Sequence, residues 1–122
     1  MQSTHGSDAR RALADQVALV SGAARGVGLA CARSIADLGA HVVLTDVDER
    51  AGSQAAQALC ADGAKATFAS LDVSDAAAIR ACVSNVAATY GRVDVLANNA
   101  GICLLADIED VTAATRKSLG VG

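Results

Sequence analysis

The feature that most constrains the fold of this chain is its alternation of short apolar runs with longer segments of helical periodicity. The four apolar runs are QVALV from Gln16, HVVLTD from His41, KATFASLDV from Lys65 and RVDVLANNAG from Arg92. QVALV is too short for a typical helix, and a continuously apolar run fits a strand buried on both faces of a parallel sheet. The other three runs are also interpreted as strands, so we expect four.

Three helices are expected between these strands. The first repeats apolar residues at helical spacing, namely Val27, Ala30, Cys31, Ile35 and Leu38. Asp48 is the expected N-cap of the second helix, and Ser74 is expected to open the third. Each helix is followed by a glycine that can adopt the left-handed conformation ending a helix, at Gly39, Gly63 and Gly91.

This order, βαβαβαβ, predicts an α/β fold: a Rossmann-type doubly wound parallel sheet with right-handed crossovers and helices on both faces. We expect the strand order 3-2-1-4, in which ligands bind beyond the carboxyl ends of the first and fourth strands. Those ends carry SGAARGVG (residues 21–28) and NNAG (residues 98–101). Residues 1–15 are polar and aperiodic, which predicts a flexible N-terminal arm before a partial Rossmann domain at residues 16–122.

The three glycines of SGAARGVG indicate that a ligand approaches the backbone closely. Gly22 would turn the chain out of the strand, Gly26 would let the backbone approach a pyrophosphate, and Gly28 would let the helix pack against the sheet. The helix N-terminus adds free N–H donors and the positive end of the helix dipole. A tight turn alone needs one glycine, so we favour a dinucleotide site, although the spacing is not GxGxxG.

Acidic residues follow the second and third strands. Asp46 lies 18 residues after Gly28, close to the roughly 20 expected for the acid that binds the adenosine ribose. Its charge would repel the 2′-phosphate of NADP, so NAD is the preferred cofactor, while Arg25 could meet such a phosphate and keeps NADP as the alternative. Asp72 has two interpretations, a ligand contact or an Asx-turn residue before Ser74.

These motifs together resemble the N-terminal half of the short-chain dehydrogenase/reductase family, from about Gln16 to the end of the chain. The resemblance implies that the glycine segment holds the pyrophosphate, that Asp46 selects NAD, that Asp72 and Val73 touch the adenine, and that NNAG braces the central strand. The cofactor-binding residues that it implies are Gly22, Arg25, Gly26, Val27, Gly28, Asp46, Asp72, Val73, Asn98, Ala100 and Gly101.

The resemblance also implies hydride transfer between the cofactor and an alcohol or carbonyl carbon, with a Tyr-x-x-x-Lys pair and a serine as catalytic groups. This sequence departs from that pattern, because its one tyrosine is Tyr90 and the residue four positions later is Asp94. The tail TAATRKSLGVG resembles the start of the family's next helix, with Gly122 at the position of a family asparagine. We therefore assign no catalytic residue and expect a truncated chain that is inactive by itself.

Truncation would leave VDVLANNAG as an exposed apolar edge, which favours self-association. Three functions remain open at this point. The chain is the cofactor-binding half of an NAD(P)-dependent oxidoreductase that acts on a small molecule, or a catalytically silent dinucleotide-binding or interaction module, or a non-functional remnant.

Composition and charge indicate which classes of partner are expected. The formal net charge is −3, from 10 basic and 13 acidic residues, and like charges do not cluster, so neither nucleic acid nor an anionic membrane is an expected partner. No apolar stretch reaches the roughly 18 residues that span a bilayer, and we expect a cytoplasmic protein. The four cysteines, Cys31, Cys60, Cys82 and Cys103, form no CxxC pair, which predicts reduced core thiols and no metal site.

Overall fold

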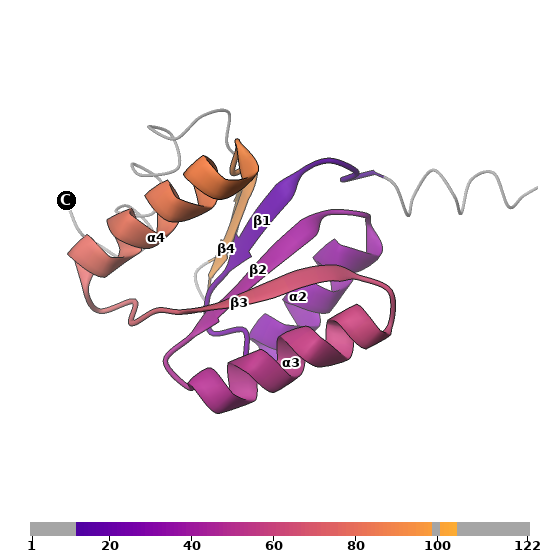
Figure 1. Ribbon diagram of the computed structural model, residues 1–122, viewed down its shortest axis with the longest axis horizontal. Coiled ribbons are helices and arrows are strands. Elements are labelled where there is room, and N and C mark those ends of the chain that lie inside the picture. Colours follow the sequence, from indigo (N-terminus) through magenta and orange to yellow (C-terminus); the bar gives the residue numbers. More distant parts are fainter. Residues whose placement is uncertain (1–11, 99–100, 105–122) are drawn as a thin grey trace, which may run out of the picture.

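A computed structural model describes residues 12–98 and 101–104 of the chain. This part forms a five-stranded sheet in the order β3-β2-β1-β4-β5 (Figure 1). In chain order the elements are β1 (Val17–Val20), α2 (Gly26–Asp37), β2 (His41–Asp46), α3 (Glu49–Ala61), β3 (Lys65–Ser70), α4 (Ala76–Tyr90), β4 (Val95–Asn98) and β5 (Gly101–Leu104). Strands β1 to β4 pair in parallel, so the expected α/β fold and its 3-2-1-4 order are confirmed.

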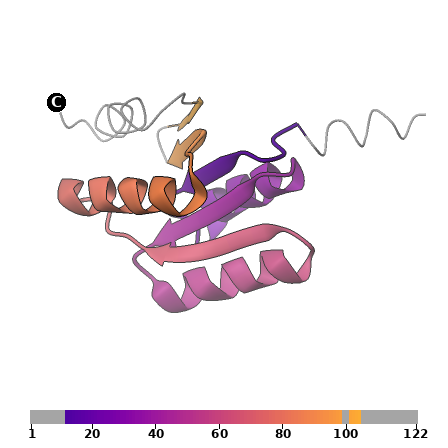
Figure 2. The same ribbon diagram turned by 45° about the horizontal axis from the view of Figure 1, so that its top comes forward.

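The sheet is covered on both faces. Helices α2 and α3 lie on one face and α4 lies on the other (Figures 1 and 2). On the α2 and α3 side the core includes Val42, Leu44 and Leu59, and on the α4 side it includes Leu19 and Val83. All four residues of β1 are buried, and burial on both faces explains why this strand is apolar throughout instead of alternating.

The helix ends largely follow the sequence. Asp48 caps α3 as expected, because its carboxylate accepts a hydrogen bond from the Ala51 N–H at 3.0 Å. Helix α4 is capped by Asp75 and not opened by Ser74. Ser74 is occupied elsewhere: its backbone N–H and its hydroxyl both donate to Asp72 Oδ1. The three expected helix-ending glycines, Gly39, Gly63 and Gly91, all have left-handed φ angles, of 101°, 93° and 81°.

Val27 and the cysteines differ in burial. Val27 is 85% exposed, because nine residues correspond to two and a half helical turns and place it opposite the buried Ala36 on α2. Cys31 and Cys82 are half-buried and pack against the core, as expected for core thiols, whereas Cys60 is exposed and departs from that expectation. Cys103 belongs to β5, and nothing is described of its side chain.

The fourth apolar run is not a single strand. Strand β4 ends at Asn98, and β5 begins at Gly101 and runs antiparallel to it, with Val95 opposite Leu104. Asn and Gly are common turn residues, which explains why the strand ends within NNAG. The expected exposed edge of β4 is therefore wrong, because β5 pairs with it, and self-association through that edge loses its structural basis.

Several expectations fall on other parts of the chain. Residues 1–11 of the expected arm and the family-like helix of the tail, residues 105–122, lie outside the described residues. Leu13, near the end of the expected arm, donates its N–H to the Leu38 carbonyl at 2.8 Å and packs against the core. None of the described helices is long and apolar enough to cross a membrane.

Candidate functional site

The glycine segment is anchored at the carboxyl ends of three strands. The Ser21 N–H donates to the Ala97 carbonyl of β4 at 2.9 Å, and the Ala23 N–H donates to the Thr45 carbonyl of β2 at 3.0 Å. Thr45 is itself buried, and its hydroxyl donates to the Val20 carbonyl at 2.9 Å. The segment therefore begins at the expected place, at the carboxyl ends of β1 and β4, with β2 on its other side.

The three glycines differ in what they permit. Gly22 and Gly26 have φ angles of 60° and 61°, in the left-handed region that glycine adopts without a steric penalty. A Cβ on Gly28 would lie 2.0 Å from the Gly22 carbonyl oxygen, whereas a Cβ on Gly26 would have no atom within 4 Å. Gly28 thus lets the first turn of α2 contact the loop, and Gly26 leaves open space beside the backbone.

The N-terminus of α2 differs from those of α3 and α4. Its N-cap residue, Arg25, makes no side-chain cap hydrogen bond. By contrast, Asp48 and Asp75 cap the other two described helices through their carboxylates. The first N–H groups of a helix have no intrahelical acceptor, and they carry the positive end of the helix dipole. The first turn of α2, without a capping acid, can therefore donate to an anion.

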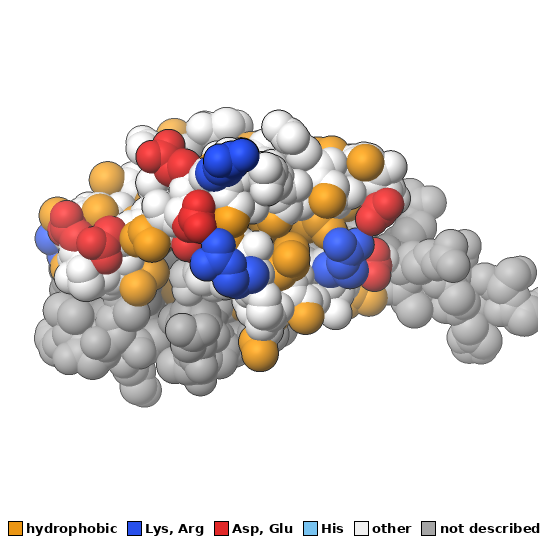
Figure 3. Space-filling view, turned by 90° about the horizontal axis from the view of Figure 1, so that it is seen from below, with side chains coloured by type: hydrophobic (Ala, Val, Ile, Leu, Met, Phe, Trp, Pro, Cys, Tyr) orange, Lys and Arg blue, Asp and Glu red, His pale blue; other side chains and the backbone are white. Residues whose placement is uncertain are grey.

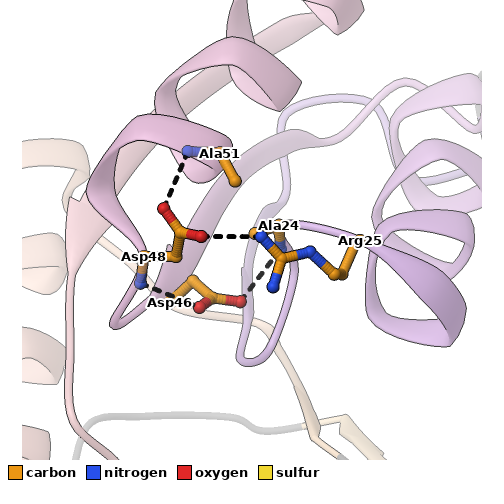
Figure 4. Close-up of polar contacts among 5 residues, drawn as sticks. All are labelled: Ala24, Arg25, Asp46, Asp48 and Ala51. Atoms are coloured by element: carbon orange, nitrogen blue, oxygen red, sulfur yellow. Dashed lines mark hydrogen bonds and ion pairs between the residues drawn. The ribbon is translucent and has the colours of Figure 1, made fainter.

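Asp46 ties the glycine segment to the end of β2. Its Oδ2 accepts a hydrogen bond from the Ala24 N–H at 3.1 Å, and its Oδ1 accepts one from the Asp48 N–H at 3.0 Å (Figure 4). A carboxylate oxygen has a second lone pair, so both oxygens could accept a further hydrogen bond from a ligand. Asp46 is also partly exposed, which leaves it accessible to one.

Arg25 and Asp48 form an ion pair beside the Asp46 carboxylate. Arg25 Nη2 lies 2.6 Å from Asp48 Oδ2, and both side chains are exposed, at 69% and 39% (Figure 4). The pKa of Asp48 lies below its ordinary value because the Ala51 N–H and the Arg25 guanidinium both hydrogen-bond to it. The pKa of Arg25 is raised, chiefly by its hydrogen bond to Asp48. Sequence reasoning identified Asp48 only as a cap and did not predict this pairing.

Three large apolar side chains are exposed, one on helix α2 and one after each of β2 and β3. Val27 is 85%, Val47 65% and Val73 41% exposed. Val27 and Val73 are among the residues that sequence reasoning selected, whereas Val47 was missed. A signal for it was present, because a large apolar residue between Asp46 and Asp48 has no place in a strand or in the core of a helix. Their exposure leaves these side chains accessible for apolar contact with a ligand.

The remaining selected residues are placed as follows. Asp72 accepts hydrogen bonds from the Ser74 N–H at 2.9 Å and the Ser74 hydroxyl at 2.7 Å, which lower its pKa and match its Asx-turn interpretation. Asn98 and Gly101 pair opposite one another at the ends of β4 and β5. Ala100 lies outside the described residues.

Tyr90 and Asp94, which do not form the family's catalytic pair, have structural contacts instead. The Tyr90 hydroxyl lies 3.3 Å from the Thr67 hydroxyl, and its ring lies 4.4 Å from the ring of His41 at the amino end of β2. The Tyr90 ring therefore lies near the amino end of β2, whereas the glycine segment lies at the carboxyl ends of the strands. Asp94 accepts a hydrogen bond from the Val17 N–H at 2.8 Å and joins the starts of β1 and β4.

Charges of both signs are mixed on one face of the molecule. On the face seen in Figure 3, acidic and basic side chains lie next to one another and do not separate into patches of one sign. Two of the described ion pairs, Arg25 with Asp48 and Arg33 with Asp62, are of this exposed kind. Among the described residues no group of three His, Cys, Asp or Glu side chains could hold a metal ion.

Known proteins are similar to this chain in both sequence and fold. A metagenomic short-chain oxidoreductase in complex with NADP has a TM-score of 0.66 and 43% identity, over 69% of this chain and 38% of that protein. A short-chain dehydrogenase/reductase from Burkholderia phymatum in complex with NAD has a TM-score of 0.66 and 36% identity, over 69% and 30%. D-threitol dehydrogenase of Mycolicibacterium smegmatis is 42% identical over 98 residues, 80% of this chain and 37% of that enzyme.

The chain spans about two fifths of the length of the curated relatives that it matches. The family defined as short chain dehydrogenase matches residues 16–119, which includes the glycine segment, Asp46 and the whole described sheet. This chain belongs to the short-chain dehydrogenase/reductase family of oxidoreductases, whose solved members include proteins with NAD and with NADP bound.

Proposed function

We propose that this chain binds NAD through the glycine segment and the N-terminus of α2. The observation that carries the proposal is the contrast between helix ends: α3 and α4 are capped by aspartates, whereas α2 has no side-chain cap and follows the glycine segment. The open space at Gly26 and the contact between Gly28 and Gly22 fit a backbone that receives a pyrophosphate. A nicotinamide dinucleotide would accept or donate a hydride when bound.

Each part of the site has a role in this proposal. The first-turn N–H groups of α2 bind the pyrophosphate, and Asp46 accepts hydrogen bonds from the hydroxyls of the adenosine ribose. Val47 and Val73 follow β2 and β3 and are exposed. In this proposal they contact the adenine. The family resemblance implies that three more residues lie beside the cofactor, and the proposal retains them: Asn98, Ala100 and Gly101.

NAD is proposed over NADP because of charge. Asp46 and Asp48 lie together, joined by a hydrogen bond of 3.0 Å, and only one cation, Arg25, is paired with them in the described chain. A ribose hydroxyl can donate to a carboxylate, whereas a 2′-phosphate cannot donate and is repelled by it. The solved relatives with NADP and with NAD show that the family uses both.

For the whole protein we propose NAD-dependent hydride transfer with a small alcohol or carbonyl compound in the cytoplasm. The resemblance to D-threitol dehydrogenase supports an alcohol as the substrate class. For these 122 residues alone, dinucleotide binding without turnover is the second candidate. It is favoured by the position of Tyr90, which contacts Thr67 on β3 and His41 at the amino end of β2, away from the glycine segment at the carboxyl ends of the strands.

Calorimetric titration of NAD into the purified chain tests the proposal. We expect saturable binding, weakened by about tenfold or more in Asp46→Ala, because hydrogen bonds to a charged acceptor are lost. Asp62→Ala is the matched control, since it removes the same charge from an exposed ion pair with Arg33 and should leave binding unchanged. A soluble, folded chain that shows no saturable binding of NAD refutes the proposal.

A further inference from the structure

We infer that Asp48 makes the site selective against NADP, by occupying the guanidinium of Arg25 and by adding a second negative charge beside Asp46. This inference rests on the proposed dinucleotide site. It assigns to Asp48 a role in specificity in addition to its role as the N-cap of α3.

The geometry concentrates three charged groups where two loops meet. Arg25 lies within the glycine segment directly before α2, Asp46 ends β2, and Asp48 is the N-cap of α3. Arg25 Nη2 and Asp48 Oδ2 are 2.6 Å apart, and the Asp48 N–H donates to Asp46 Oδ1 at 3.0 Å. Figure 4 shows the Arg25 side chain reaching across to Asp48, with the Asp46 carboxylate close by.

The balance of charge decides which ligand this cluster accepts. Two carboxylates and one guanidinium leave one net negative charge. A phosphate monoester adds a charge of about −1.5 to −2 near neutral pH, so it would need Arg25 as its partner. Asp48 already holds Arg25 Nη2 and offsets its charge, so a phosphate would have to share or take over this guanidinium and would be repelled by both Asp48 and Asp46. A ribose hydroxyl requires no cation, so NAD avoids both costs.

Asp48→Asn separates the charge of this residue from its structural role. In the wild-type chain the Ala51 N–H donates to Asp48 Oδ1 at 3.0 Å. Asparagine is about as good an N-cap as aspartate, so we expect the variant to keep this hydrogen bond. The substitution removes the ion pair and releases Arg25. An exposed ion pair contributes little to stability, so the thermal midpoint should barely change.

The test is the ratio of dissociation constants for NADP and NAD, measured by calorimetry at low salt on the full chain. Asp48→Asn should shift this ratio toward NADP by about tenfold, because one charge-assisted contact to a phosphate becomes available. Asp62→Asn makes the same change of charge in the Arg33–Asp62 pair, where the two charged groups are 3.0 Å apart, and should leave the ratio unchanged. High salt should reduce the shift, because the groups are exposed.

Arg25→Ala assigns the effect to the guanidinium. In the Asp48→Asn background it should abolish most of the gain in NADP binding, whereas in the wild-type chain it should change the ratio little. A persistent gain in the double variant overturns the role of Arg25. An unchanged ratio in Asp48→Asn, with NAD still bound by the wild-type chain, overturns the inference and leaves the proposed function standing. If neither dinucleotide binds to any variant, the proposed function and the inference both fail.

Discussion

Replacing Gly28 by alanine tests how closely the first turn of α2 must approach the glycine segment. The added Cβ would lie 2.0 Å from the Gly22 carbonyl oxygen, 2.7 Å from the Gly22 carbonyl carbon and 3.2 Å from the Ala23 Cα. All three are backbone atoms, which cannot rotate away as a side chain can. The segment or the helix must therefore shift by about 1 Å, since Cβ atoms are essentially never found under 3.0 Å from such neighbours.

Two opposing effects set the size of the change. Overpacking a well-packed site costs about 1–3 kcal/mol, and we take the upper end because backbone is displaced. Alanine is favoured over glycine in a helix by about 1 kcal/mol. The free energy of unfolding should thus fall by about 2 kcal/mol, which lowers the midpoint of thermal unfolding by about 10 °C in a domain of this size.

Urea unfolding followed by circular dichroism measures the change, provided that the slope with denaturant is unaltered. Ala30→Gly is the matched control, because Ala30 is an exposed residue of the same helix and its loss should cost only the helix-propensity difference of about 1 kcal/mol. NAD binding should weaken in Gly28→Ala, since the Gly22 carbonyl is displaced. If Gly28→Ala instead stabilises the chain by about 1 kcal/mol, Gly28 is an ordinary helical glycine and the reasoning is refuted.

Three further changes test the packing of the fold by urea unfolding. Gly52→Ala should destabilise the chain by up to about 2 kcal/mol, because its Cβ would lie 2.0 Å from the Phe68 ring and the overpacking cost of about 1–3 kcal/mol exceeds the helix gain of about 1 kcal/mol; an equal loss in a Phe68→Leu background would contradict this. Burial lowers the pKa of His41, so stability should be complete above its unfolded pKa of about 6.5 and fall as the pH drops below it; His41→Phe should flatten this dependence between pH 7.5 and 5.5, and an unchanged curve would count against it. Asp94→Ala should cost about 1–3 kcal/mol by leaving the buried Val17 N–H without its acceptor, whereas a cost as small as that of exposed Asp62→Ala would exclude this role.

The sequence predicted the elements that depend on neighbouring residues. Helix spacing, the Asp48 cap and the glycine at the end of each helix are local signals, and the structure confirms them. Ser74 was a reasonable helix start on the same rules, but Asp72 takes its N–H and hydroxyl, and Asp75 caps α4 in its place. Which of two adjacent polar residues caps a helix depends on the hydrogen bonds that each makes in the folded chain. Residue identities alone do not specify those bonds.

The candidate site divides in the same way. The glycine segment and Asp46 could be selected from sequence because glycine conformations and strand ends are local features. The second role of Asp48 could not, because its pairing with Arg25 depends on what lies nearby in space. Val27 shows what spacing leaves open: it belongs to the helical repeat of apolar residues, yet it is 85% exposed, because spacing does not state which side of the helix meets the sheet.

By itself the sequence determined the alternation of strands and helices, the glycine-rich turn and the family to which the chain belongs. Only the tertiary structure decided that β5 covers the edge of β4, that Asp94 joins two strand starts, and that Arg25 pairs with Asp48 across 23 residues. The physical reason is that hydrophobic periodicity and backbone conformation act over a few residues. Ion pairs, strand pairing and exposure arise between segments that only folding brings together.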